Sequence, residues 1–70
     1  MTVEISDEAL LTDLMRAFAR SGCHVDRTAD SACRVVHPVA TNQNEALPEV
    51  AFFVRAWQLG HPDVGTTIAA

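Results

Sequence analysis

The chain has 70 residues, a formal net charge of −4 and a hydrophobic fraction of 49%. Its five cationic side chains are all Arg and form no basic stripe, which argues against binding to nucleic acid or to a membrane surface. A chain of this length predicts one domain, 1–70, that buries only about 60% of its unfolded surface on folding. Because much apolar surface is then left to cover, we expect a homo-oligomer, most simply a dimer.

The first third of the chain predicts a strand followed by an amphipathic helix. Residues 2–5 (TVEI) alternate polar and apolar side chains, which is typical of a short half-buried strand. Ser6 is a candidate N-cap for the next helix, with Asp7 and Glu8 in its first turn. Gly22 is a natural residue to end that helix. The apolar residues that recur at helical spacing in it are Leu11, Leu14, Met15 and Phe18.

Residues 23–38 (CHVDRTADSACRVVHP) predict a β-hairpin with its turn at residues 28–31 (TADS). A polar connection, 39–44, then leads to a second helix that ends at Gly60. Because Pro48 belongs in the first turn of a helix, we expect the regular helix to begin between Asn44 and Leu47.

The second helix and the residues after it complete the predicted fold. The helix carries an apolar stripe of Val50, Phe53, Val54 and Trp57. Residues 64–69 (VGTTIA) then form a short final strand. The β-α-β-β-α-β order predicts an α+β, ferredoxin-like split βαβ fold. In it, two helices cover one face of a four-stranded antiparallel sheet. The aromatic residues of the second helix are expected in the core; alternatively, Phe52 or Trp57 lies at the rim of an interface or pocket.

The uncovered face of this sheet is predicted to be polar. Its expected members are Thr2, Glu4, His24, Asp26, Arg34, Val36 and Thr67. It lacks the exposed aromatic residues on which RNA bases stack. Two uses of the surface remain open: self-association, face to face or by edge pairing of the second or fourth strand, and a small ligand held at an oligomer interface. His24, Asp26 and Arg34 are therefore candidate ligand or interface residues, together with Phe52, Trp57 and His61.

Two cysteines and three histidines raise the question of thiol or metal chemistry. If Cys23 lies opposite Val35, then Cys33 and His37 are its diagonal neighbours, each about 7 Å away. Cys33 and His37 are then roughly 13 Å apart along one strand, so one metal ion cannot bind all three. We therefore expect no metal and no cofactor. Cys23 also follows the carboxyl end of a helix, where the dipole disfavours a thiolate.

No motif of an enzyme class is present, so a non-catalytic protein-interaction or small-ligand-binding module is the favoured interpretation. The alternative is a thiol- or metal-dependent activity centred on Cys23 with His37 or Cys33. His61, near the carboxylates of Asp7 and Glu8 in the predicted topology, is a candidate pH-sensitive contact, although a His there more often caps the helix or faces solvent.

The cellular compartment is expected to be the cytoplasm. No apolar run approaches the ~20 residues of a membrane span, and residues 1–8 lack the features of a signal peptide. Two cysteines are too few for a disulfide framework, so both thiols are expected to be reduced.

The segments DLMRAFARSGCHV, EVAFFVRAW and HPDV together resemble a group of short bacterial proteins, chiefly actinobacterial, with no assigned activity. The resemblance covers most of the chain and implies a bacterial cytoplasmic protein. In element order alone the chain is also similar to ACT modules, which bind amino acids. The glycine that follows the first strand of those modules is replaced here by Ser6 and Asp7, so no ligand residues are transferred.

Overall fold

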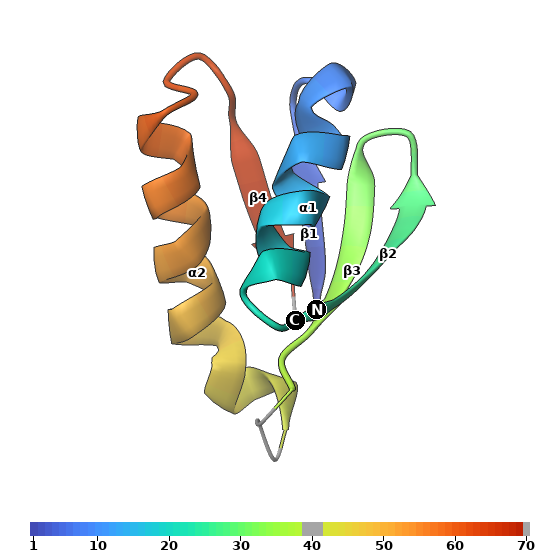
Figure 1. The fold of residues 1–70 in the computed structure, drawn as a ribbon, viewed down its shortest axis with the longest axis vertical. Coiled ribbons are helices and arrows are strands. Elements are labelled where there is room, and N and C mark those ends of the chain that lie inside the picture. The colour runs from blue at the N-terminus through green and yellow to red at the C-terminus, as the bar shows by residue number, and fades with distance from the viewer. Residues whose placement is uncertain (39–41, 70) are drawn as a thin grey trace.

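Four strands form one antiparallel sheet in the order β2-β3-β1-β4, in a computed structural model that describes residues 1–38 and 42–69. The strands are β1 (Thr2–Ile5), β2 (His24–Ala29), β3 (Ala32–Val36) and β4 (Thr66–Ala69). The helices are α1 (Leu11–Arg20) and α2 (Gln43–Leu59). Both helices lie on the same face of the sheet (Figure 1). The predicted ferredoxin-like α+β fold is confirmed.

The connection from β1 to α1 differs from the prediction in its capping residue. A single 3-10 turn, Glu8–Leu10, precedes α1, and its N-cap is Asp7, whose Oδ1 accepts from the Ala9 N–H at 3.0 Å. Ser6 was expected in this role, and that prediction is wrong. Its hydroxyl instead accepts from the Gly65 N–H at 2.8 Å, and its own N–H donates to the Gly65 carbonyl at 2.9 Å. Ser6 therefore joins the end of β1 to the start of β4.

The hairpin of β2 and β3 is longer and tighter than predicted. Ala29 pairs with Ala32, so the turn consists of Asp30 and Ser31 rather than four residues. One residue of β2, Thr28, is extra relative to β3, because Arg27 pairs with Cys33. The bulge and the short turn together place Val25, not Cys23, opposite Val35. The expected Cys23–Val35 register is therefore wrong by two residues.

α2 begins earlier than predicted. Its N-cap is Asn42, whose side chain accepts from the Glu45 N–H at 3.0 Å, and the helix begins at Gln43. Pro48 consequently lies inside the helix and not in its first turn. A strong cap at Asn42 fixes the start of the helix in spite of the proline. Part of the predicted 39–44 connection, residues 39–41, lies outside the described residues.

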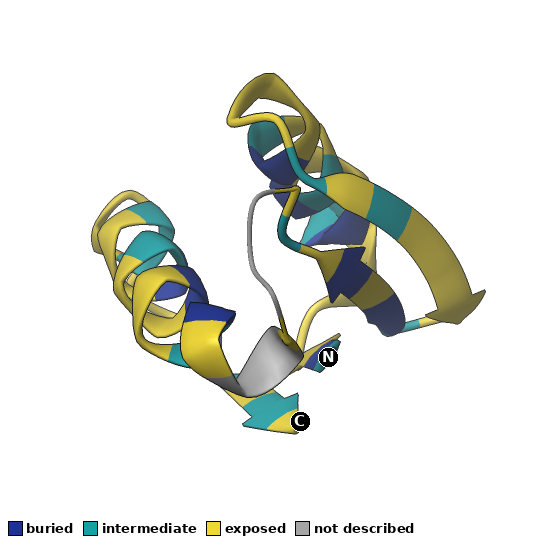
Figure 2. Cartoon of the chain, turned by 90° about the horizontal axis from the view of Figure 1, so that it is seen from below, coloured by how far each residue is buried: buried dark blue, intermediate teal, exposed yellow. Residues whose placement is uncertain are grey.

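The core lies between the sheet and the two helices, where the buried residues gather (Figure 2). Phe18 of α1 is 1% exposed, and its ring stacks on that of Phe53 of α2 with 4.6 Å between centroids. The predicted stripe of α2 is confirmed, since Val50 and Val54 are buried and Phe53 and Trp57 pack against the core. The largest fully buried side chains are Phe18, Leu11, Leu14, Val3, Val35, Val54 and Cys33. Neither described helix is long and apolar enough to cross a membrane.

Candidate functional site

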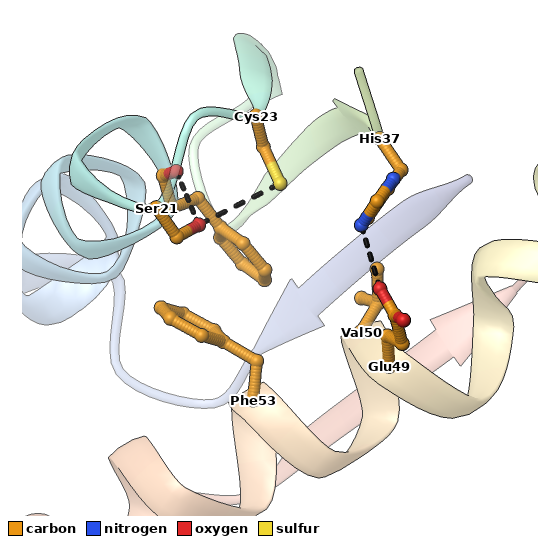
Figure 3. Close-up of a pocket in the computed structure, with 7 residues that line it drawn as sticks. Ser21, Cys23, His37, Glu49, Val50 and Phe53 are labelled. Atoms are coloured by element: carbon orange, nitrogen blue, oxygen red, sulfur yellow. Dashed lines mark hydrogen bonds and ion pairs between the residues drawn. The ribbon is translucent and has the colours of Figure 1, made fainter. Parts of the chain in front are cut away.

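A cavity of about 210 Å³ opens between the carboxyl end of α1 and the first half of α2. We call it the α1–α2 pocket; it is lined by Phe18, Ser21, Cys23, His37, Glu49, Val50 and Phe53. Figure 3 shows that these side chains come from the end of α1, the residue before β2, the residue after β3, and α2. Three separate segments of the chain, residues 18–23, His37 and residues 49–53, therefore contribute to one site.

The floor of the α1–α2 pocket is apolar. The stacked rings of Phe18 and Phe53 form one side, with an angle of 28° between their planes, and Val50 lies beside them. Phe18 and Val50 are buried, whereas Phe53 is half-buried and presents part of its ring to the cavity. A flat aromatic floor of this kind suits a planar apolar group.

At the rim, a hydrogen bond joins the residue after β3 to α2. His37 Nε2 lies 2.7 Å from Glu49 Oε2, and at that distance the imidazole N–H donates to the carboxylate. The His37 side chain is 18% exposed and that of Glu49 is 71% exposed, so the carboxylate also faces solvent. The sequence did not mark Glu49 as a site residue. Its pairing with His37, twelve positions earlier, has no local sequence signal.

Cys23 lies on the opposite side of the pocket from Glu49 (Figure 3). Its Sγ is 3.6 Å from Ser21 Oγ, which also donates to the Phe18 carbonyl at 2.7 Å. A hydroxyl has one proton, and the short distance to the Phe18 carbonyl shows that Ser21 donates it there. Ser21 therefore does not also donate a strong hydrogen bond to the Cys23 sulfur. The β2–β3 register pairs His24 with Val36, and its continuation sets Cys23 beside His37. The two side chains share the pocket, with His37 Nε2 directed at Glu49.

Cys33 is not among the residues that line the α1–α2 pocket. It is fully buried in the central part of the sheet, paired with Val3 of β1 and Arg27 of β2. Burial raises the pKa of the Cys33 thiol above its usual value, and the nearby Arg27 guanidinium partly opposes this. Both cysteines are free thiols. Of the two partners suggested for Cys23, the structure brings His37 into the same pocket and leaves Cys33 in the core.

A second polar cluster joins the two helices at the other end of α2. Trp57 Nε1 donates to Asp13 Oδ2 at 3.1 Å, and His61 Nε2 lies 3.6 Å from the same oxygen. The rings of Trp57 and His61 stack at 4.0 Å, and His61 Nδ1 is 3.1 Å from the Trp57 carbonyl. His61 therefore contacts a carboxylate, as suggested, but the carboxylate belongs to Asp13 and not to Asp7 or Glu8. Asp13 is 44 positions before Trp57, and no sequence pattern links them.

The other predicted site residues lie apart from the α1–α2 pocket. His24, Asp26 and Arg34 are exposed on the uncovered face of the sheet, where Arg34 Nη2 is 4.0 Å from Asp26 Oδ2. Phe52 was expected in the core with the other aromatic residues of the second helix; it is instead 77% exposed on the outer side of α2. The structure thus distributes the predicted residues over the open face of the sheet, the outside of α2 and the Asp13 cluster.

Neither a metal-binding group nor a match to a known protein assigns a function to this chain. Among the described residues, no three His, Cys, Asp or Glu side chains form a group that could hold a metal ion. No protein-family model, no curated protein and no solved structure matches the chain. The resemblance to short actinobacterial proteins stays a prediction.

Proposed function

We propose that the chain is a non-catalytic small-ligand-binding module that acts as a cytoplasmic homodimer, and that its ligand is a small aromatic amine held in the α1–α2 pocket. The observation that carries the proposal is the combination of a stacked aromatic floor with an accessible carboxylate at one rim. Ligand sites in proteins characteristically combine apolar walls with a few placed polar groups.

The size of the pocket limits the ligand. Its volume is about 210 Å³, whereas an apolar cavity of roughly 150 Å³ accommodates benzene. One ring with a short polar substituent therefore fills the site.

The charges at the pocket favour a cation over an anion. The residues that line it include the carboxylate of Glu49, which is bonded on one side by the His37 imidazole, and no Arg, and the chain as a whole has a net charge of −4. An ammonium group at the rim would donate to the free side of the Glu49 carboxylate while the attached ring lies on Phe53. A cation close to an aromatic face gains a further attraction of about 0.5–2 kcal/mol.

Nuclear magnetic resonance titration with benzylamine tests this proposal, with benzoate as a probe of the same ring and opposite charge. We expect benzylamine to shift the amide signals of Phe18, Cys23 and Phe53, and benzoate to leave them unchanged. Glu49→Gln should weaken benzylamine binding about tenfold, the effect of losing one charge-assisted hydrogen bond. Glu45→Gln is the matched control, since it removes the same charge from the same helix outside the pocket. Equal binding of benzoate, or no shifts at these residues, would contradict the proposal.

The alternative is a thiol-dependent activity of Cys23, and one observation favours it: Cys23 and His37 line the same pocket. Alkylation by iodoacetamide separates the two functions. A ligand-binding module should be alkylated at Cys23 at the rate of an ordinary thiol, and Cys23→Ser should still bind benzylamine. A rate more than tenfold higher that falls in His37→Gln, or stoichiometric zinc after purification without chelator, would favour the alternative.

A further inference from the structure

The outer edge of β2 is an uncovered strand edge. β2 stands at one end of the sheet, and of its six residues Val25 is half-buried and the rest are exposed. An edge strand presents unpaired backbone N–H and C=O groups that another strand can bond. The bulge at Thr28 distorts the second half of β2, so the regular part of this edge is the stretch from His24 to Arg27.

We propose that two copies of the chain pair antiparallel along β2, with Val25 facing Val25 of the partner subunit, so that the two sheets form one sheet of eight strands. The inference deepens the homodimer part of the proposed function and rests on it. The α1–α2 pocket shares Cys23 with this edge, but its other lining residues lie on the α2 side of α1 or on α2 itself.

Symmetry limits the register of such a pair. Two identical antiparallel neighbours in one sheet are related by a two-fold axis perpendicular to that sheet, and residues directly opposite each other point to the same face. The axis must therefore pass midway between a residue and its own copy in the partner subunit. Within the regular stretch this leaves four centres: His24, Val25, Asp26 and Arg27.

The charges of the facing residues and the length of the paired stretch favour one of these four centres. A centre at Asp26 sets two carboxylates directly opposite each other, and a centre at Arg27 does the same with two guanidinium groups and reaches the bulge at Thr28. Like charges directly opposite across strands are destabilising. A centre at His24, the first residue of β2, pairs each later residue of the strand with a residue that precedes the strand. A centre at Val25 uses residues 23–27 and sets His24 opposite Asp26 of the partner subunit, twice.

This register also extends contacts that each chain already makes. On the open face, Asp26 pairs with Arg34 of β3, at 4.0 Å between Oδ2 and Nη2. In the dimer its other side faces the partner's His24, so a row of Arg, Asp and His crosses the interface in each direction. Favourable cross-strand side-chain pairs contribute roughly 0.2–1 kcal/mol each.

On the helix-covered face of the sheet, this register places an apolar groove of each subunit next to the interface. A groove between α1 and β2 is lined by Thr12, Met15, Arg16, Ala19, Val25 and Arg27. The Arg27 guanidinium is held toward the hairpin turn by the Asp30 carbonyl at 3.0 Å and the Thr12 hydroxyl at 3.2 Å. The apolar part of the groove, around Val25 and Met15, is thereby left facing the axis. The opposite edge, β4, has four residues of which none is charged, so no charge pattern there selects a register.

Sedimentation velocity of two variants tests the proposed interface. His24→Asp places two like-charged pairs across the axis, and we expect it to raise the dimer dissociation constant at least tenfold. Ala69→Asp is the matched control, because it adds the same charge to the same face on β4, opposite the uncharged Thr2, and it should stay dimeric. Circular dichroism checks that both variants keep their fold. A monomeric wild-type chain would overturn the homodimer itself, whereas a dimer that is indifferent to His24→Asp would overturn this interface alone.

A disulfide trap gives a second, positive test. Facing residues of an antiparallel pair have Cα atoms about 4.5–5.5 Å apart, within the range that a disulfide spans. In a Cys23→Ser background, Val25→Cys should form a covalent dimer rapidly under mild oxidation, while Thr28→Cys, in the bulge, should form it slowly. Equal rates for the two cysteines, or no covalent dimer from Val25→Cys, would contradict the register. Benzylamine titration of the His24→Asp monomer then reports separately on the ligand pocket.

Discussion

At the scale of single residues, the fold makes ionisation of the Cys33 thiol less favourable. Burial keeps its thiol protonated, so its pKa in the folded chain lies above the ordinary 9.0. At a pH between the Cys33 pKa of the unfolded chain and that of the folded chain, the folded chain keeps the thiol proton and the unfolded chain has released it. Stability is then complete below the unfolded pKa and falls as the pH rises toward the folded one.

We therefore predict that the wild-type chain loses stability above pH ~9 and that Cys33→Ala loses less over the same interval. The chain contains no Tyr, and its cationic side chains are all Arg, so few other side chains titrate there. Urea unfolding at about pH 8 and at about pH 10.5 measures the effect, whose steepest slope is about 1.4 kcal/mol per pH unit for one proton. Parallel pH curves for the two proteins would contradict it.

At the scale of elements, the start of α2 depends on one capping side chain. Asn42 accepts from the Glu45 N–H, which satisfies one of the donors that every helix leaves unpaired at its start. Pro48, in the second turn, has no N–H to donate to the Asn44 carbonyl and so weakens the same end of the helix. The cap is thus needed more here than in a helix without an internal proline.

Asn42→Ala should lower the free energy of unfolding by about 1 kcal/mol, and Asn42→Asp should retain most of the wild-type stability because aspartate caps equally well. The measurement is thermal or urea unfolding followed by circular dichroism. Stability unchanged in Asn42→Ala would show that α2 does not rely on this cap.

The elements themselves could be predicted because their signals are local. Short segments of sequence are enough to predict the apolar stripe from Val50 to Trp57. The same holds for the helix end at Gly22, which has a φ of 96°. The register of the β2–β3 hairpin could not be predicted, since it depends on the extra residue at Thr28. That bulge depends on how β2 fits β3, and no pattern within either strand specifies it.

At the scale of the whole molecule, the functional site was the least predictable feature. The sequence offered Cys23 and His37 as partners, and the structure does place them in one pocket. The apolar floor and the Glu49 carboxylate were missed, because they meet His37 only after both helices dock on the sheet. Pocket geometry follows from this docking, whereas helix and strand patterns follow from segments of about ten residues.

Docking of α1 against α2 therefore deserves its own test, and the Asp13–Trp57 hydrogen bond provides one. The contact joins the two helices at the end away from the α1–α2 pocket. In a double-mutant cycle, Asp13→Ala and Trp57→Phe should show a coupling of about 0.5 kcal/mol, small because the hydrogen bond is partly exposed.

Asp13→Asn should keep part of that coupling, since the amide oxygen still accepts from the indole N–H. Circular dichroism during urea unfolding is the readout, because Trp57→Phe removes the chain's one Trp. If the two helices hold the pocket between them, the double variant should also bind benzylamine more weakly than wild type although neither residue lines the pocket. Additive single effects together with unchanged binding would show that the sheet alone positions each helix and that the pocket is preformed without this contact.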